Sequence, residues 1–231
     1  MDANIRYTPW DSEVLGMDTY ELTDSSDQTL SKTTNIPGHF TVKVDPLSTK
    51  QYLHEFGFYY CDTLLKPCCR KDQFLKYINS RIRISEREEL NDLLAISNGA
   101  YRHGRFHRDF NVGKPGAHKR YDRWLSQLYK ENVVWGLLYD KELAGFAAIK
   151  ENGILLYALK EKFRGRGLGK SFFSSVCDQL FQMGNEEIYT SVSACNLAMI
   201  NMVMSVGFRI KEVVDVYHKF NPEKLKKGTK Q

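Results

Sequence analysis

Hydrophobic positions in the second half of the chain form short runs separated by turn-forming residues. Runs with alternating or continuous apolar character between turn-forming residues are typical of strands. The pair Asn152-Gly153 between two such runs is typical of a hairpin turn. The pattern therefore predicts a series of strands, at Arg81–Ile84, Val133–Tyr139, Leu143–Lys150, Ile154–Leu159, Ile188–Ser193 and Phe208–Phe220.

Helical spacing appears between these runs. Leu168, Phe172, Val176 and Leu180 recur every four residues, which predicts an amphipathic helix. A second helix is predicted from Asn196 to Val206, and Gly207 is its expected stop signal. Two further helices are predicted at 85–97, where Ser85 and Glu88 have the spacing of a capping box, and at 121–129.

The first 80 residues show a weaker pattern. Strands are predicted at His39–Val44 and Gly57–Leu65, a helix at Ser48–Phe56, and an ordered loop at Trp10–Gly16. We expect residues 1–80 to form a small α/β subdomain and residues 81–220 to form the main domain. Residues 221–231 are lysine-rich and are expected to be a flexible tail.

Composition narrows the function classes. The chain has 231 residues, of which 42% are hydrophobic and 26% charged, with a net charge of +5 that the tail partly supplies. No run approaches a membrane span and the start lacks a signal region, so a cytoplasmic protein without nucleic-acid or membrane partners is expected. The five cysteines lack metal-ligand spacing, which predicts free thiols and no metal: Cys61, Cys68, Cys69, Cys177 and Cys195.

The segment Phe163-Arg164-Gly165-Arg166-Gly167-Leu168-Gly169-Lys170 is the strongest chemical signal. It joins a predicted strand to a predicted helix, and glycines there leave backbone N–H groups bare. The positive end of a helix then favours a phosphate group. The glycine spacing fits neither a P-loop nor a dinucleotide fingerprint.

Arg-x-x-Gly-x-Gly at a strand-to-helix turn resembles the acetyl-CoA loop of the Gcn5-related N-acetyltransferase (GNAT) family. The order of strands and helices and the segment Asn196…Gly207-Phe208 carry the same resemblance over residues 81–220. It implies an α/β (α+β) fold with a mixed, mostly antiparallel twisted sheet flanked by helices, and acetyl-CoA as co-substrate. The residues implied in binding acetyl-CoA are Tyr157, Ala158, Leu159, Arg164, Gly165, Arg166, Gly167, Leu168, Gly169, Lys170 and Asn196.

The segments Trp10-x-Ser12, Gly57-Phe58 and Arg105-Phe106-His107 resemble, within that family, the acetyltransferases that act on dTDP-linked fucosamine. This implies that the acceptor is a nucleotide-linked amino sugar used for a surface polysaccharide. Between residues 101 and 121, basic side chains alternate with aromatic ones, which suits a diphosphate and a sugar or base; a solvated basic loop is the alternative. The candidate acceptor-binding residues are Arg102, His103, Arg105, Phe106, His107 and Tyr121.

The resemblance implies direct attack of an amine on the thioester, with backbone N–H groups near Tyr157 to Leu159 polarising the carbonyl. The family's usual proton-donating tyrosine corresponds here to Val203. Three alternatives follow. Catalysis could proceed without a proton donor, or Tyr217 or His218 could replace it, although these two lie on opposite faces of the last predicted strand. The protein could also bind acyl-CoA without turnover. The candidate bases are His103, His107 and His118, or Asp109 and Glu13 through a water.

We name Tyr217 and His107 as the candidate catalytic pair. An acetyltransferase for a peptide or antibiotic amine is a further alternative, and a homodimer is considered.

Overall fold

The computed structural model describes residues 3–86 and 88–222, which form two compact units. Unit 1 comprises the described residues of Met1–Thr63, Arg105–Ala117 and Val214–Gln231, and unit 2 comprises Leu64–Gly104 and His118–Val213. This division differs from the expected boundary at residue 80, because β4 (Tyr59–Arg70) and β11 (Arg209–Asn221) each begin in one unit and end in the other. Most of the tail expected at 221–231 lies outside the described residues.

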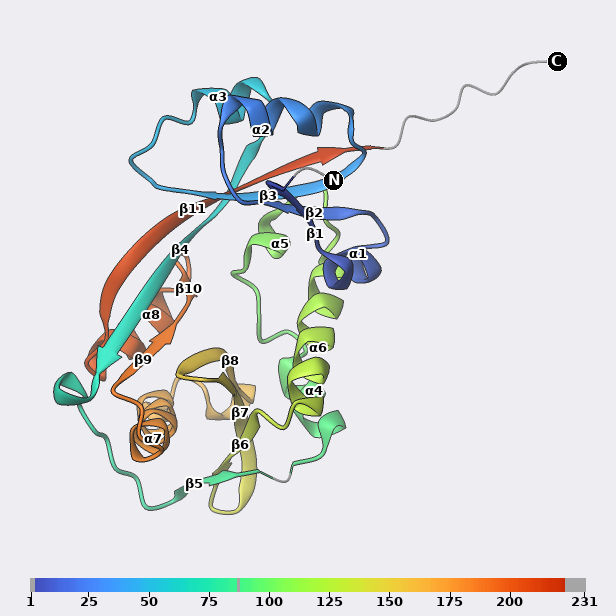
Figure 1. Ribbon diagram of the computed structural model, residues 1–231. Coiled ribbons are helices and arrows are strands. Elements are labelled where there is room, and N and C mark those ends of the chain that lie inside the picture. The colour runs from blue at the N-terminus through green and yellow to red at the C-terminus, as the bar shows by residue number, and fades with distance from the viewer. Residues whose placement is uncertain (1–2, 87, 223–231) are drawn as a thin grey trace. The chain divides into compact units, whose positions relative to one another are not determined.

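Unit 2 contains a mixed sheet in the order β4-β9-β8-β7-β6-β5, with β10 beside β4 (Figure 1). Its strand pairs are antiparallel except for β8 and β9, which run parallel. The remaining strands are β5 (Ile82–Ser85), β6 (Val134–Tyr139), β7 (Glu142–Lys150), β8 (Gly153–Leu159), β9 (Glu187–Thr190) and β10 (Val192–Ser193). The helices and 3-10 turns are η2 (Lys71–Gln73), α4 (Leu90–Ser97), α6 (Lys114–Lys130, which begins in unit 1), η3 (Glu161–Phe163), α7 (Leu168–Gln182) and α8 (Leu197–Ser205).

Helices cover both faces of this sheet. One core joins side chains of α7 and α8, among them Phe172, Val176 and Leu180, to one face of the strands. A second core joins α4 and α6 to the opposite face, where Phe146 and Leu156 are buried. The expected α+β architecture, a mixed and mostly antiparallel sheet flanked by helices, is therefore confirmed.

The predicted strands and helices of residues 81–220 are present, with local corrections. The capping box is wrong: Ser85 ends β5, and α4 begins after Glu89, whose side chain makes no capping hydrogen bond. Helix α6 is longer than the predicted 121–129 because it begins at Lys114. The predicted strand 188–193 is divided in two, since Val192 and Ser193 pair with β4.

Unit 1 has a sheet in the order β1-β2-β3-β11-β4, in which β2 and β3 are parallel. Its other elements are β1 (Ile5–Tyr7), α1 (Pro9–Leu15), β2 (Thr19–Leu22), α2 (Asp27–Lys32), η1 (Thr33–Asn35), β3 (Gly38–Val44), α3 (Gln51–Glu55) and α5 (Arg105–Arg108). The loop expected at Trp10–Gly16 is wrong, because this segment is helix α1. Pro9 occupies its first turn, where a missing N–H is harmless, and Gly16 caps it at φ 67°.

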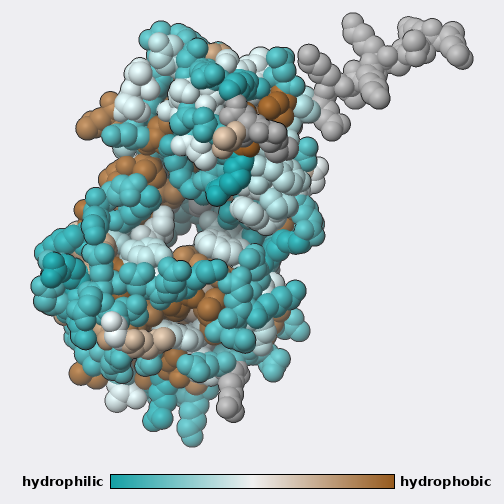
Figure 2. Space-filling view, in the orientation of Figure 1, coloured by the Kyte–Doolittle hydropathy of each residue, from teal (hydrophilic) through white to brown (hydrophobic). Residues whose placement is uncertain are grey.

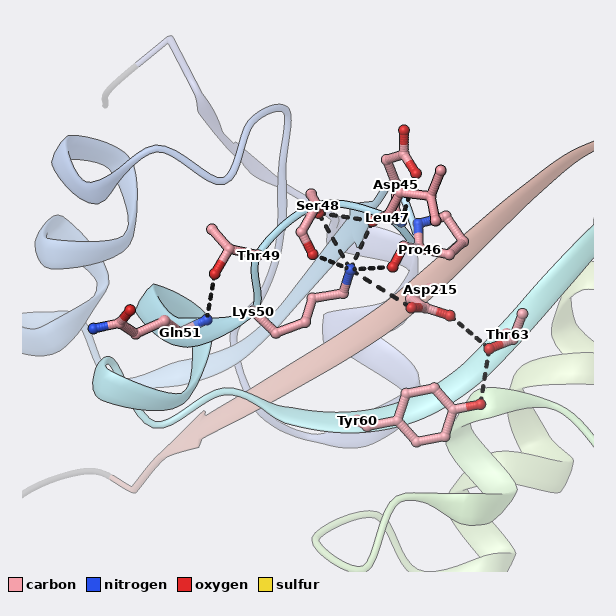
Figure 3. A network of polar contacts seen from close by, with 10 residues as sticks. All are labelled: Asp45, Pro46, Leu47, Ser48, Thr49, Lys50, Gln51, Tyr60, Thr63 and Asp215. Carbon is pink, nitrogen blue, oxygen red and sulfur yellow. Dashed lines mark hydrogen bonds and ion pairs between the residues drawn. The ribbon is translucent and has the colours of Figure 1, made fainter.

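The loop between β3 and α3 is fixed by one ammonium group (Figure 3). Lys50 Nζ donates hydrogen bonds to the carbonyl oxygens of Asp45, Pro46 and Ser48 at 2.6, 3.1 and 2.9 Å, and lies 3.7 Å from a carboxylate oxygen of Asp215. Thr63 Oγ1 in turn donates to the Asp215 carboxylate at 2.6 Å. Side chains of β4 and β11 thus anchor a loop that has little regular structure of its own.

Hydrophilic residues cover most of the face drawn in Figure 2, and hydrophobic residues form small separate areas. No helix among the described residues is both long and apolar enough to cross a membrane. All five cysteines are free thiols, as expected, and four of them are buried.

Candidate functional site

The glycine-rich segment forms the turn that the sequence predicts. After η3, the chain passes through Gly165 at φ 69° and Gly167 at φ 74° and enters α7. A Cβ atom at either glycine would meet no atom within 4 Å, so glycine is required here by the left-handed backbone and not by lack of space. The turn consequently presents an open, exposed backbone.

This backbone has the properties of an anion site. Among the described residues, no acceptor pairs with the N–H groups of Gly165, Arg166 or Gly167, and no side chain caps α7. The N-terminal N–H groups of this 15-residue helix add a partial positive charge. A pyrophosphate bound here would receive several backbone hydrogen bonds, which supports the predicted cofactor loop.

The basic side chains of the loop have different surroundings. Arg164 Nε donates to the Leu159 carbonyl at 2.7 Å and thereby ties the loop to the end of β8. Lys170 Nζ lies 4.3 Å from the centre of the Tyr77 ring. Arg166 is exposed and, unlike Arg164, has no such hydrogen bond among the described residues.

Strand β8 separates from β9 after its first two residues. The parallel pairing includes only Gly153 with Tyr189 and Ile154 with Thr190. From residue 155 to 159, β8 has no strand partner on that side among the described residues. The sheet is therefore splayed between β8 and β9.

The register shows which backbone groups face this open edge. Lys160 N donates to the Ala144 carbonyl at 2.7 Å, so every second residue of β8 before it, including Ala158, bonds to β7. Tyr157 and Leu159 consequently direct their N–H and carbonyl groups away from β7, toward the open edge. Ala158 was expected to offer its backbone to the cofactor. That expectation is wrong, because its N–H belongs to the β7 ladder and its side chain is buried in the second core.

Two further expected cofactor residues have structural roles. Asn196 accepts a hydrogen bond from Met199 N at 3.2 Å as the N-cap of α8, which occupies its side-chain oxygen. The Tyr157 hydroxyl donates to the Gly169 carbonyl at 3.1 Å and holds β8 against the first turn of α7. Val203, at the position of the usual tyrosine, is fully buried in the core between α8 and the sheet.

A pocket of about 450 Å³ opens beside the start of the splay. Trp124, Leu155 and Tyr189 supply its apolar and aromatic wall. A Cβ on Gly153 would lie 2.6 Å from the Tyr189 ring, so this glycine lets the ring lie against the backbone.

Two ion pairs line the same pocket: Lys66 with Glu212 at 2.7 Å and Lys211 with Glu187 at 2.9 Å. Cys68 also lines it, but burial, with the neighbouring Glu187 carboxylate, raises the pKa of its thiol to about 12. The thiol therefore stays protonated and is a poor nucleophile. The pocket therefore offers no reactive thiolate for a covalent relay through sulfur.

The expected acceptor residues are divided between the units. Arg102, His103 and Tyr121 belong to unit 2, whereas Arg105, Phe106 and His107 belong to unit 1. Phe106 is 3% exposed and packs in a core cluster, so its ring cannot stack on a ligand without rearrangement; this part of the expectation is wrong.

The other members of this set have defined contacts. Arg102 Nε donates to the Gly99 carbonyl at 3.0 Å, and Tyr121 stacks on Tyr101. The Arg105 guanidinium lies 4.8 Å from the centre of the Phe106 ring. His107, the candidate base, is half-buried on α5 and its role stays a prediction.

Tyr217 and His218 lie on opposite faces of β11, as strand alternation requires. Tyr217 is 6% exposed in the apolar core of unit 1 with Phe40 and Leu53, which is the environment of a packed aromatic residue. Burial is the main cause that raises its pKa. Its packing does not support the role of proton donor.

His218 belongs to a buried polar cluster that the sequence does not reveal. Asp109 Oδ2 lies 2.6 Å from His218 Nδ1 and 2.7 Å from His39 Nε2. Tyr59 and the Asn111 backbone N–H donate to the other carboxylate oxygen at 2.9 and 2.8 Å. Burial raises the pKa of Asp109, but the contacts with His218, His39 and the Asn111 N–H outweigh it and hold the pKa well below its usual range.

Burial lowers the pKa of His218 to about 3, so the ring is neutral at physiological pH. His39, Asp109 and His218 have ligand types that could hold a metal ion. Their separations of 2.6 and 2.7 Å are, however, those of hydrogen bonds. They come from β3, the segment after α5 and β11, which explains why no local motif reveals them.

Comparison with known proteins agrees with this geometry. Residues 103–208 match the acetyltransferase (GNAT) family. Members of that family use acetyl-CoA as acyl donor and act on amines, and the match supports an acetyl-CoA-dependent N-acetyltransferase. The matched residues include the glycine-rich loop, strands β8 and β9 on the two sides of the splay, and Val203. No curated protein matches the chain significantly.

Solved structures show the same GNAT fold at low sequence identity. A GNAT protein from Sphaerobacter thermophilus has a TM-score of 0.58 and 14% identity; the alignment covers 81% of this chain and 62% of that protein. A conserved protein of unknown function from Staphylococcus epidermidis has a TM-score of 0.63 and 13% identity, with 96% and 92% covered. A tandem GNAT protein from the clavulanic acid biosynthesis pathway has a TM-score of 0.55 and 9% identity, with 90% and 79% covered.

Proposed function

We propose that this protein transfers an acetyl group from acetyl-CoA to the amine of a small molecule. The observation that carries the proposal is the continuity of one binding path within unit 2. The open edge of β8 ends at Leu159, Arg164 ties the end of that strand to the glycine loop, and the loop begins α7. A phosphate site and a strand edge whose N–H groups have no strand partner among the described residues are thus joined over a few residues.

The residues of this path have separate tasks. The N–H groups at Gly165 to Gly167 and the first turn of α7 would hold the pyrophosphate. The backbone of Tyr157 and Leu159 would pair with the extended arm, as a missing strand would. A Tyr157 N–H directed at the thioester carbonyl would stabilise charge that develops on its oxygen. Acetyl-CoA supplies the activated acyl group.

We further propose that the acceptor is an amino sugar, linked to a nucleotide. The aromatic faces of Trp124 and Tyr189 beside two Lys–Glu pairs in the unit 2 pocket support a sugar, whose hydroxyl groups can exchange hydrogen bonds with those charged side chains. The nucleotide part is supported by the basic residues Arg102 and His103 of unit 2 and by the resemblance to dTDP-fucosamine acetyltransferases. The cytoplasmic location and the homodimer remain predictions.

Release of CoA thiol from acetyl-CoA, measured with a panel of amines, tests this proposal. The panel pairs dTDP-linked 4-amino-4,6-dideoxy sugars with the same sugars without nucleotide, and adds a peptide amine and an aminoglycoside. We expect the nucleotide-linked sugar to have the highest kcat/KM, because remote binding energy positions the amine. Equal kcat/KM for free and linked sugars would contradict the nucleotide assignment, and transfer to the peptide alone would contradict the sugar.

A non-catalytic acyl-CoA-binding protein is the second candidate. The buried Val203, which offers no proton at the usual position, favours it. This function predicts saturable acetyl-CoA binding without thiol release for any amine of the panel.

A further inference from the structure

Two hydroxyl groups of unit 2, those of Ser97 and Tyr101, are buried without a hydrogen-bond partner among the described residues, and the larger side chain is that of Tyr101. Tyr101 follows α4, and its hydroxyl oxygen has no partner among the described residues. An unsatisfied buried polar group is destabilising, and native structures keep few of them without a functional reason. The group therefore needs an explanation.

The surroundings of this hydroxyl place it at the open edge of β8. Tyr101 packs against the core that contains Leu156 and Ala158 of that strand. Burial, together with the neighbouring Tyr121 hydroxyl, raises the pKa of Tyr101 well above its ordinary value, so the phenol is protonated at neutral pH. The Arg164 guanidinium and a contact with the Tyr157 backbone N–H act in the opposite direction. The hydroxyl thus lies beside the N–H group assigned to the thioester carbonyl.

The ring is fixed in this position before any ligand binds. It stacks on Tyr121 with centroids 4.3 Å apart and planes inclined by 8°. A Cβ on Gly104 would lie 2.3 Å from the Tyr121 hydroxyl, so the glycine provides the room that Tyr121 needs. A catalytic group held by packing in this way needs no reorganisation when the substrate arrives.

We propose that Tyr101 donates a proton to the departing thiolate of CoA, the role that Val203 cannot perform. This inference rests on the proposed function. The amine nitrogen bonds to the carbonyl carbon, the C–S bond breaks with its electron pair on sulfur, and sulfur takes the proton from Tyr101 Oη. The tyrosinate, stabilised by Arg164, takes the proton that the new amide nitrogen loses, through water. The products are the acetamide and CoA thiol, and Tyr101 is restored.

The first test is Tyr101→Phe, which keeps the ring stack and removes only the hydroxyl. The matched control is Tyr129→Phe, which removes a hydroxyl bonded to the Glu88 carbonyl at 3.0 Å in the same unit. Thiol release is measured with the best acceptor of the panel, and acetyl-CoA affinity by calorimetry. We expect kcat to fall about 10²–10⁴-fold in Tyr101→Phe with an unchanged Kd for acetyl-CoA, and no change in the control.

A second readout separates proton transfer from packing. Replacing Tyr101 by 3,5-difluorotyrosine, a more acidic phenol of similar shape, is expected to move the alkaline limb of the kcat–pH profile toward neutral pH. Full kcat in Tyr101→Phe, or an unmoved limb in the fluorinated protein, would overturn the role of Tyr101 alone. A wild-type protein that binds acetyl-CoA and releases no thiol with any amine would instead overturn the proposed function.

Discussion

Gly167→Glu is the sharpest test of the cofactor loop. The residue has φ 74° at the start of α7, and its missing Cβ faces open space. A glutamate therefore fits without a clash and costs only the left-handed backbone strain, about 1–2 kcal/mol. The variant should fold, with a melting temperature about 2–8 °C below that of the wild type. Its carboxylate would project from the backbone that the pyrophosphate is expected to occupy.

The effect on ligand-induced stabilisation follows from mass action. At an acetyl-CoA concentration 100 times Kd, the wild type gains about 2.7 kcal/mol, which raises the melting temperature by roughly 5–11 °C. Two unit charges about 4 Å apart repel by about 4 kcal/mol at an effective dielectric constant of 20, so at least a 100-fold loss of affinity is expected. The gain then falls to about 0.4 kcal/mol, a shift of about 1 °C.

Gly184→Glu is the matched control at the opposite end of α7. Gly184 also has a positive φ, 95°, and open space at its Cβ. Both variants should lose similar intrinsic stability, measured by thermal denaturation without ligand, but only Gly184→Glu should keep the full acetyl-CoA shift. A wild-type shift in Gly167→Glu would show that acetyl-CoA does not bind at this loop.

Three further predictions concern stability. Asp109→Asn should lower the free energy of unfolding by about 3 kcal/mol in urea titration, because the contacts of Asp109 are divided between two accepting oxygens and an amide keeps only one of them; an unchanged midpoint would contradict it. The free energy of unfolding should fall as the pH drops from about 6.5 toward 3, because His218 takes up a proton in the unfolded chain while its pKa in the folded protein is about 3. Below pH 4 the lowered pKa of Asp109 in the folded protein adds to the loss. A flat urea midpoint over this range would contradict the burial of a neutral His218. Gly207→Ala should lower the free energy of unfolding by more than about 3 kcal/mol, because the new Cβ would lie 2.2 Å from the Gln73 carbonyl oxygen and the backbone has a φ of 103°. Soluble expression with an unchanged melting temperature would disprove this prediction.

The parts of the fold that sequence predicts well are those with strong local signals. Helix α7 repeats an apolar residue every four positions, and β7 and β8 are joined by the Asn152-Gly153 hairpin; both were predicted within about two residues. Helix α1 was missed although Pro9 and Gly16 mark its two ends, because its seven residues bury only Asp11 and Ser12 and so lack an apolar stripe. The local sequence pattern therefore does not predict a helix that buries few apolar side chains.

Local sequence patterns do not reveal sites whose residues lie far apart in the chain. The glycine loop is contiguous, and its backbone was predicted from glycine positions alone. His39, Asp109 and His218 are brought together from segments 70 and 109 residues apart, so no spacing rule reveals them. Tyr101 lies in a segment without helical or strand periodicity, and only the path of the chain after α4 shows that its hydroxyl is buried beside β8.

The helix–Gly–Phe–strand turn, by contrast, occurs in both units. Gly57 donates its N–H three residues back at 3.0 Å and Gly207 does so at 3.2 Å, while Phe58 and Phe208 donate five residues back at 2.8 and 3.2 Å. Both phenylalanines are buried, and each turn leads into a long strand, β4 or β11. In each unit this turn ends a helix and is followed by a buried phenylalanine, so its role is structural. The anion-binding loop belongs to unit 2, and no comparable glycine turn begins a helix among the described residues of unit 1. Acetyl-CoA binding is therefore attributed to the unit with the loop, and the shared turn by itself carries no argument for a second cofactor site.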